Sequence, residues 1–186
     1  MGREKIGDIA KIQNGYAFKS SLFVKAGLSI LRISDITNSV VKKGTVYYPE
    51  NIDIPKRFKI YKGDILIAMS GATTGKIGMY IDKEESMLNQ RVGKFIPTKD
   101  TDNNFLYVYL SSAQFRQSLL SLLVAGAQPN VSTKDLENIT LDVPSYTEQQ
   151  QIGYFFNKFD VLINNKKQKL NLLKQRKQGF LQKMFV

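Results

Sequence analysis

The stretch from Ser70 to Ile77, Ser-Gly-Ala-Thr-Thr-Gly-Lys-Ile, has the residue types of a phosphate-binding loop. In a P-loop, four residues separate the two glycines and a Ser or Thr follows the Lys, where its hydroxyl binds magnesium. Here three residues lie between Gly71 and Gly75, and Ile77 follows Lys76. The spacing argues against nucleotide hydrolysis and leaves two interpretations. The segment is either a Gly/Thr turn between strands or a loop whose amides, hydroxyls and lysine contact a DNA backbone.

Side chains that would perform other reactions on nucleic acid are missing or scattered. The chain has no Cys and no His, which removes the thiolate nucleophile, the commonest general base and the usual ligands of zinc. No Lys follows an Asp or Glu at a distance of two residues, a spacing that suits a metal-dependent nuclease. Pro-Pro, part of the catalytic motif of amino-methyltransferases, is also absent. The sequence therefore predicts a protein with no catalytic residues and no metal or cofactor of its own.

A strongly basic composition points instead to a polyanionic partner. The 27 Lys and Arg against 16 Asp and Glu give a formal net charge of +11, which suits nucleic acid or an anionic membrane surface. Arg and Gln side chains form paired hydrogen bonds with guanine and adenine in the major groove. Cationic, amide and hydroxyl side chains in and around predicted loops make up the candidate DNA contacts. They are Lys19, Arg32, Thr73, Thr74, Gly75, Lys76, Arg91, Gln128 and Asn130.

Each of these candidates also has a purely structural interpretation. The Thr73–Lys76 segment suits a turn, and Arg91, which follows Leu-Asn-Gln, can brace a sheet as well as read a base. Gln128 and Asn130 flank a proline and can cap the helix expected just after them. The residue types alone do not decide between these roles.

The elements that must position these residues alternate between strands and helices in the first part of the chain. Short apolar runs bounded by Gly, Pro, Asn or Asp indicate strands, expected at Leu28–Ile36, Ile65–Met69, Lys76–Ile81, Arg91–Ile96 and Ile139–Val143. One helix, capped by Asn103 or Asn104, is expected to run to about Val124. A short helix should follow Ser132, with Asp135 completing a capping box. Residues 1–146 are therefore predicted to form a mixed α/β domain within an α+β fold.

From residue 147 onward the pattern changes to that of one long helix. Thr147-Glu148-Gln149-Gln150 fits a capping box, and no Pro follows it. Apolar residues then recur at alternate spacings of four and three, as on the contact face of a coiled coil. This seam consists of Ile152, Phe156, Phe159, Ile163, Leu170, Leu173, Phe180 and Met184, interrupted by Lys166 and Lys177. Residues 147–186 are predicted to form a spacer and dimerisation helix roughly 55 Å long. The seam either packs on the preceding domain or pairs with a second helix.

Targeting and membrane segments are not evident. The N-terminal Met-Gly-Arg-Glu-Lys-Ile-Gly-Asp lacks the apolar core of a signal peptide. The most apolar run, Ser118–Ala127, is far too short to span a bilayer. We therefore expect a cytoplasmic protein that acts without a membrane partner.

Taken together, several segments resemble the specificity subunits of type I restriction–modification enzymes. Each is weak alone, but six occur in the family's order. The matching segments are Gly7-Asp8-Ile9 with Asn14–Lys19, Leu31–Ile36, Gly63–Gly78, Leu88–Val92, Ala127–Ser132, and Pro144 through Glu148-Gln149-Gln150 to Phe185. The resemblance implies a target recognition domain followed by a long helix that forms an antiparallel coiled coil.

That resemblance further implies a binding module without catalytic activity. The domain would recognise one half of a two-part site on double-stranded DNA. The helix would act as a spacer and as the seat for the modification (methyltransferase) subunit and, with it, the restriction subunit. S-adenosylmethionine, ATP and Mg²⁺ would belong to those partners. The family's usual chain contains two such units, whereas this sequence contains one. We expect either a half-length subunit that forms a homodimer through the helix or a piece of a longer chain.

Two other classes of function stay open from the residues alone. One is a small stand-alone nuclease or methyltransferase, which an activity assay on the pure protein would reveal. The other is a coiled-coil adaptor with incidental basic charge. Such an adaptor would lack the steep salt dependence that phosphate contacts give to DNA binding.

Overall fold

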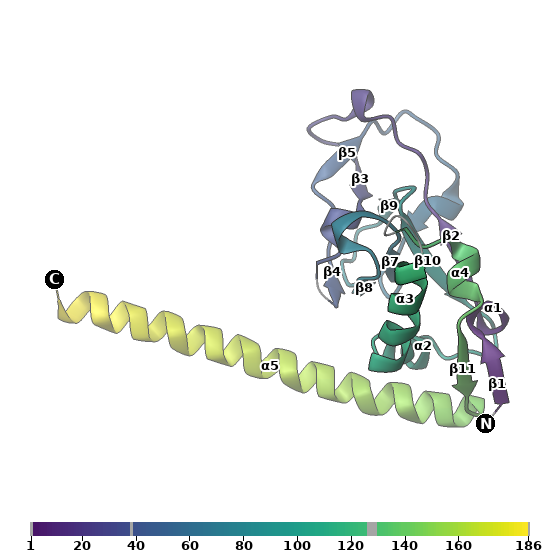
Figure 1. The fold of residues 1–186 in the computed structure, drawn as a ribbon. Coiled ribbons are helices and arrows are strands. Elements are labelled where there is room, and N and C mark those ends of the chain that lie inside the picture. Colours follow the sequence, from purple (N-terminus) through teal and green to yellow (C-terminus); the bar gives the residue numbers. More distant parts are fainter. Residues whose placement is uncertain (1, 38, 126–129, 186) are drawn as a thin grey trace.

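The described chain comprises residues 2–37, 39–125 and 130–185 of a computed structural model, and one long helix extends from its body of small sheets and helices (Figure 1). The strands are β1 (Gly2–Lys5), β2 (Ala10–Asn14), β3 (Leu28–Leu31), β4 (Val40–Val41), β5 (Val46–Tyr48), β6 (Lys59–Ile60), β7 (Ile65–Ala68), β8 (Ile77–Tyr80), β9 (Ser86–Leu88), β10 (Val92–Pro97) and β11 (Thr140–Val143). The helices are α1 (Ile6–Ile9), α2 (Asn103–Leu110), α3 (Ala113–Ala125), α4 (Thr133–Glu137) and α5 (Tyr146–Met184). Short 3₁₀ turns occur at η1 (Ser20–Leu22), η2 (Ile33–Asp35), η3 (Lys56–Phe58) and η4 (Gly71–Thr73). This combination confirms the predicted α+β class.

A five-stranded sheet with the order β2-β10-β7-β8-β4 forms the centre of the domain. Its middle strand, β7, reads Ile-Leu-Ile-Ala, and all of its residues are buried. Successive side chains on a strand point to opposite faces. Ile65 and Ile67 therefore join the core beneath α1–α4, while Leu66 and Ala68 join a second core on the other face. An unbroken apolar run suits this strand because both of its faces are covered.

A four-stranded sheet with the order β5-β3-β9-β6 covers that second face. Leu31 and Leu88 point toward β7, whereas Ile30 and Met87 point away into an aromatic cluster. In that cluster the rings of Tyr16, Phe18, Tyr48 and Phe58 meet edge to face, with centroids 4.9–5.5 Å apart. The two sheets thus form layers, with helices on one side and aromatic side chains on the other.

Four of the five predicted strands are confirmed as β7, β8, β10 and β11, with ends that differ by one residue at most. The predicted strand Leu28–Ile36 is wrong beyond Leu31, where the chain enters η2. The cause is local, because the Asp35 carboxylate accepts a hydrogen bond from the Arg32 amide at 2.8 Å and so favours a turn over an extended strand. Sequence reasoning also missed β1, which pairs antiparallel with β11.

The predicted cap of α2, Asn103 or Asn104, lies one or two residues after the true one. Asp102 is the N-cap, and its carboxylate accepts from the Phe105 amide at 2.9 Å. The Asn103 side-chain amide instead donates to the Gly63 carbonyl at 3.0 Å and so holds the helix against the turn that precedes β7 of the central sheet. Asp and Asn cap helices about equally well, so tertiary contacts decided which residue took the role.

The same helix was wrongly predicted to continue to Val124 without a break. It ends at Leu110, and a second helix, α3, starts after Ser112. The Ser112 hydroxyl accepts from the Phe115 amide at 3.2 Å, as an N-cap does. The break changes the direction of the chain and lets α3 lie beside the β7–β8 connection (Figure 1).

The cap of α4 is confirmed. The Asp135 amide donates to the Ser132 hydroxyl at 3.1 Å, and the Asp135 carboxylate accepts from the Ser132 amide at 3.0 Å. Hydrogen bonds from the Ser132 hydroxyl and amide hold the pKa of Asp135 below its usual value. This box fixes the start of α4 just after the described residue Asn130.

The cap predicted at Thr147 is wrong, because α5 begins at Tyr146 and Ser145 is its N-cap. The Ser145 hydroxyl donates to the Glu148 carboxylate at 2.9 Å and the Ser145 amide does so at 3.0 Å, and these two bonds lower the pKa of Glu148. Gln149 is buried, accepts from the Asp102 amide at 2.9 Å and donates to the Pro144 carbonyl at 3.1 Å. Its amide therefore fastens the start of α5 to the start of α2.

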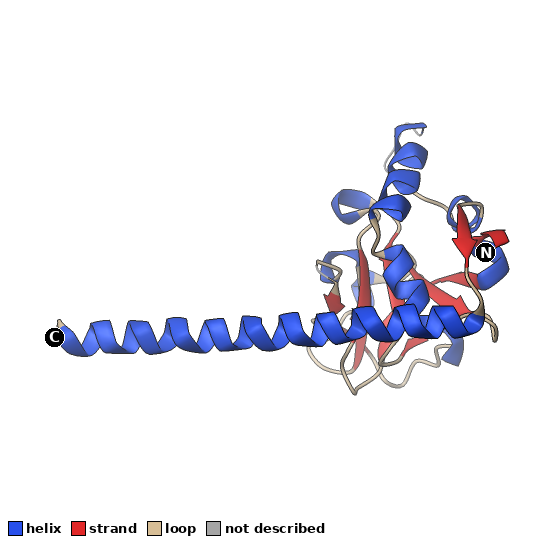
Figure 2. Cartoon of the chain, turned by 90° about the horizontal axis from the view of Figure 1, so that it is seen from below, coloured by secondary structure: helices blue, strands red, loops and turns tan. Residues whose placement is uncertain are grey.

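Beyond this anchor, α5 lies against α2 and then leaves the domain (Figure 2). A Cβ on Gly153 would stand 2.7 Å from Cβ of Asn104, so only glycine permits this approach. Further along α5 the seam is open to solvent, with Phe159 48% and Leu173 51% exposed, whereas Ile163 lines a hollow shared with Val40 and Ile81 of the domain. Phe159 and Leu173 are therefore not covered by their own domain. No helix in the described ranges is both long enough and apolar enough to cross a membrane.

Candidate nucleic-acid interface

The connection between β7 and β8, residues 70–76, is a tightly bonded loop. The Gly75 amide donates to the Ala68 carbonyl at 2.8 Å, and the Ala68 amide donates to the Lys76 carbonyl at 3.0 Å. Inside the loop, the Thr74 hydroxyl donates to the Gly71 carbonyl at 2.6 Å. These bonds hold the lysine at the start of β8 in a defined position.

Gly75 is required at its place in the loop. Its φ is +83°, in the left-handed region, and an added Cβ would lie 2.3 Å from Cδ2 of the buried Leu119 on α3. Left-handed backbone costs an L-residue roughly 1–2 kcal/mol, and here the leucine would also have to move. The Gly/Thr loop is thus packed against α3.

We predict that Gly75→Ala lowers the free energy of unfolding by more than that backbone cost of roughly 1–2 kcal/mol. Gly63→Ala is the matched control, because Gly63 also has a positive φ, +96°, but has no atom within 4 Å of its added Cβ. Urea unfolding of both variants measures the difference. Equal losses would contradict the packing of the loop on α3.

A second turn, from Asn89 to Arg91, joins β9 to β10 and rests on the end of β2. The Tyr16 amide donates to the Leu88 carbonyl at 2.7 Å, and the Gln90 amide donates to the Tyr16 carbonyl at 2.9 Å. A Cβ on Gly15 would stand 2.2 Å from the Leu88 carbonyl oxygen. The Asn14-Gly15-Tyr16 and Leu88–Val92 segments are therefore one structural unit.

This turn and the β7–β8 loop border a hollow of about 730 Å³, which we call the Arg91 hollow. Its floor is held together by the Met69 amide, which donates to the Arg91 carbonyl at 2.9 Å, and by the Met69 carbonyl, which accepts from the Val131 amide at 3.0 Å. The lining residues are Asn14, Met69, Ser70, Gly71, Gln90, Arg91, Asn130, Val131, Ser132 and Thr133. Amides, hydroxyls and one guanidinium thus converge on one space.

Ser70 adds an unusual feature to the Arg91 hollow. Its hydroxyl oxygen is buried and has no hydrogen-bond partner among the described residues. Buried polar atoms in native proteins are almost always paired.

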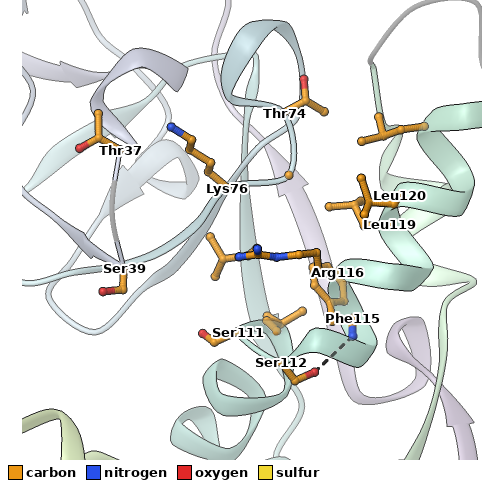
Figure 3. A pocket seen from close by; sticks show the side chains of 14 residues that line it. Thr37, Ser39, Thr74, Lys76, Ser111, Ser112, Phe115, Arg116, Leu119 and Leu120 are labelled. Atoms are coloured by element: carbon orange, nitrogen blue, oxygen red, sulfur yellow. Dashed lines mark hydrogen bonds between the residues drawn. The ribbon is translucent and has the colours of Figure 1, made fainter.

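On the other side of the β7–β8 loop lies a second hollow, of about 510 Å³, which we call the Lys76 hollow. Lys76 and Arg116 both line the hollow; in Figure 3 the Arg116 side chain reaches across from α3, while the Lys76 side chain runs from the β7–β8 loop toward Thr37. Its lining residues are Thr37, Ser39, Thr74, Gly75, Lys76, Ile77, Leu110, Ser111, Ser112, Phe115, Arg116, Leu119, Leu120 and Leu123. Because the loop forms a wall of both hollows, the two are neighbours on one surface.

The charge of this surface is positive. None of the described residues that line either hollow is an Asp or a Glu, whereas Lys76, Arg91 and Arg116 all line one or the other. Two lysines elsewhere are instead paired with carboxylates: hydrogen bonds with Glu84 and Glu85 raise the pKa of Lys43 and Lys59 respectively. Within the described ranges, no three Asp, Glu, His or Cys side chains gather to hold a metal. The surface is therefore built for an anion.

The predicted site residues separate into two groups. Thr74, Gly75 and Lys76 line the Lys76 hollow, and Arg91 and Asn130 line the Arg91 hollow. The remaining ones that the structure describes lie elsewhere. The Thr73 hydroxyl donates to the Ile33 carbonyl at 3.0 Å, and the Arg32 Nε atom lies 3.7 Å from Oδ2 of Asp35. Lys19 directly precedes η1. Gln128 falls outside the described residues. Contact with DNA stays a prediction for every member of the set.

Sequence reasoning missed Arg116 and Asn14. Arg116 is the single charged residue of α3, Ala-Gln-Phe-Arg-Gln-Ser-Leu-Leu-Ser-Leu-Leu-Val-Ala, and it is exposed. A lone arginine in an otherwise uncharged helix was the signal that was available. Asn14 ends β2, and its proximity to Arg91 follows only from the pairing of β2 with β10.

Comparisons with known proteins all point to one family. Residues 3–175 match the family described as the type I restriction modification DNA specificity domain. The type I restriction enzyme MjaVIII specificity subunit of Methanocaldococcus jannaschii is 30% identical over 184 residues, 95% of this chain and 43% of that protein. The EcoAI specificity subunit of Escherichia coli is 32% identical over 181 residues, 94% of this chain and 30% of that protein. The chain thus spans less than half the length of these relatives.

Solved structures show the same fold. The S subunit of a type I restriction-modification system from M. genitalium superposes with a TM-score of 0.65 at 17% identity, over 93% of this chain and 42% of that one. The corresponding subunit from Thermoanaerobacter tengcongensis gives a TM-score of 0.61 at 16% identity, over 88% and 38%. These likenesses extend to the arrangement of the strands and the helices.

Proposed function

Because the chain belongs to the type I restriction modification DNA specificity domain family, we propose that it recognises one half of a two-part site on double-stranded DNA. The observation that carries the proposal is the pair of neighbouring hollows that contain cations but no described carboxylate. Phosphate contacts position a protein on DNA, and contacts to base edges specify the sequence. Each hollow suits one of these two kinds of contact.

Base reading belongs to the Arg91 hollow. An arginine forms paired hydrogen bonds with O6 and N7 of guanine, and Asn or Gln does so with N6 and N7 of adenine. Arg91, Gln90, Asn14 and Asn130 supply these side-chain types around one space, and the Ser70 hydroxyl there lacks a partner. This set is therefore the proposed specificity-determining surface.

The seam of α5 supports a homodimer. A two-fold axis at Gln168 would bring every seam position opposite another in antiparallel helices, which is the isologous arrangement of a symmetric dimer. The apolar pairs would be Ile152 with Met184, Phe156 with Phe180 and Ile163 with Leu173, and the seam lysines would pair as Lys166 with Leu170 and Lys177 with Phe159. No seam position is left over in this register.

Such a dimer would hold two recognition domains at a set distance. At 1.5 Å per residue, the two Gly153 docking points would lie about 45 Å apart, compared with about 34–36 Å for one turn of DNA. Two identical domains related by a two-fold axis would read inverted identical half-sites. The expected target is an interrupted palindrome with half-sites slightly more than one turn apart.

The remaining partners follow from the same proposal. The dimer would seat a modification subunit along α5 and, through it, a restriction subunit, and would act in the cytoplasm. S-adenosylmethionine, ATP and Mg²⁺ would bind to those subunits. Co-purification of the chain with its modification subunit, followed by sequencing of the methylated positions, tests the assembly and the palindrome together. Methylation at asymmetric sites would contradict the homodimer.

We predict that the pure protein neither cleaves nor methylates DNA. The described residues offer no cluster of carboxylates for a catalytic metal. The assay incubates the pure chain and a plasmid with Mg²⁺ and with S-adenosylmethionine in separate reactions. Cleavage or methyl transfer that co-elutes with the protein over successive columns would favour a stand-alone enzyme instead.

A coiled-coil adaptor with incidental charge is the remaining alternative. An adaptor would bind DNA weakly and without sequence preference. Selection of binding sites from a random duplex library, followed by affinity measurements at several salt concentrations, separates the two. A selected consensus supports recognition, and its absence together with a shallow salt dependence would favour the adaptor.

A further inference from the structure

Lys76 and Arg116 approach the same space from elements that are distant in sequence. Lys76 precedes β8, and Arg116 lies in the first turn of α3 (Figure 3). Neither side chain forms an ion pair or a hydrogen bond with another side chain in the described part of the protein. Two cations that line one hollow without a counter-charge in it repel each other, and an anion placed between them offsets that repulsion.

The wall around these cations contains hydroxyl groups. Thr37, Ser39 and Ser111 line the Lys76 hollow, and a hydroxyl can donate a hydrogen bond to a phosphate oxygen. A guanidinium, which presents paired donors, and an ammonium, which is a compact charge, both suit phosphate. The chemistry around the space is therefore that of a phosphate site.

The α3 wall beyond Arg116 is apolar. Leu119, Leu120 and Leu123 of α3 line it, and Leu120 is 52% exposed. A volume of about 510 Å³ exceeds what one phosphate group occupies. A sugar attached to that phosphate would cover the leucines, which matches a nucleotide unit of a backbone better than a bare ion.

The position of the hollow identifies the source of the phosphate. Gly71 lines the Arg91 hollow, while Thr74 and Lys76, a few residues further along the same rigid loop, line the Lys76 hollow. A backbone phosphate bound at Lys76 would thus lie next to the bases read at Arg91. We propose that Lys76 and Arg116 clamp one phosphodiester of the recognised duplex, with its deoxyribose against α3.

This clamp rests on the proposed function, and it would fix the position of the protein along the DNA. One phosphate held by two side chains places the Arg91 hollow over a defined base pair without reading sequence itself. Its loss should weaken binding to all sequences by the same factor. Without the clamp, binding should also release fewer counterions from the DNA. The slope of log K against log salt should therefore become shallower by about 0.9 for each phosphate no longer neutralised.

The test uses Lys76→Gln, Arg116→Gln and the double variant of the full chain. Lys83→Gln is the control, because Lys83 is exposed and lines neither hollow. The probes are a random-sequence duplex and the duplex selected by the wild-type protein. Each single change should weaken binding to both probes roughly tenfold, leave their affinity ratio unchanged, and leave the unfolding midpoint where the control has it.

The double variant decides whether the phosphate is shared. A clamp on one phosphodiester predicts a slope loss of about 0.9 per protomer even when both cations are removed. A loss near twice that value would mean two separate phosphates and would overturn the clamp. Arg116→Lys, which keeps the charge and folds with a minimal change, should keep the wild-type slope while binding more weakly.

Three further outcomes would overturn the proposal. They are an unchanged slope in the double variant, a loss of base preference in Arg116→Gln, and saturable stabilisation by inorganic phosphate alone that the double variant loses while its DNA slope stays at the wild-type value. The last would assign the hollow to a free anion. Failure of the proposed function would look different, because the wild-type protein would then select no consensus while the slopes on the random duplex still report on the clamp.

Discussion

We expect Ile163→Glu to convert the proposed homodimer into monomers and to lower the affinity for a palindromic site by about a hundredfold or more, the scale of a lost second binding module. Ile163 is 46% exposed on α5. In the register centred on Gln168 it faces Leu173 of the other chain, so the substitution would place a carboxylate against an apolar side chain of the seam. Sedimentation equilibrium at micromolar concentration measures the mass.

Leu172→Glu is the matched control for this change. Leu172 lies on the same helix, is similarly exposed at 51%, and stands nine residues, or two and a half turns, from Ile163. It therefore lies on the opposite face and should leave the dimer intact. A monomeric wild-type protein, or equal dissociation by both variants, would contradict pairing through the seam.

Phe159→Glu tests the register rather than the dimer. In the proposed register Phe159 faces Lys177 of the other chain, so a glutamate there would meet an opposite charge. We expect this variant to remain dimeric although it also places a carboxylate in the seam. Dissociation of Phe159→Glu together with Ile163→Glu would show that the helices pair in a different register.

Arg91→Ala will lower the affinity for the selected site by about 1–3 kcal/mol for each half-site and relax the preference at one base pair in each. The Arg91 backbone carbonyl accepts from the Met69 amide at 2.9 Å, and that bond survives the substitution. The side chain lines the Arg91 hollow and is exposed. A loss of affinity should therefore reflect the missing contact with a base and not a misplaced turn.

Selection from a random duplex library by the variant and by the wild-type protein measures this change. Arg57→Ala is the control, because Arg57 stacks on the Phe58 ring and lines neither hollow. If Arg91→Ala selected the unchanged consensus with the same loss on random DNA, Arg91 would contact a phosphate. The base-reading surface would then have to be assigned to Asn14, Gln90 and Asn130.

Patterns over neighbouring residues determined a large part of this architecture. The central strand β7 is visible as an unbroken apolar run, and α4 is visible from Ser132 and Asp135, because strand burial and helix caps depend on residues close in sequence. The seam of α5 follows from its spacing alone. The absence of Cys and His, and of any Asp or Glu two residues before a Lys, likewise indicated binding rather than catalysis before any fold was known.

The tertiary structure decided which of these residues meet. Lys76 and Arg116 face one hollow only because α2 ends at Leu110 and lets α3 turn back over the β7–β8 loop. Asn14 reaches the Arg91 hollow only because β2 pairs with β10. Strand partners and the direction of a chain after a helix break depend on how distant apolar faces cover one another. No pattern over adjacent residues contains that information, so Arg116 and Asn14 were found in space and not in the sequence.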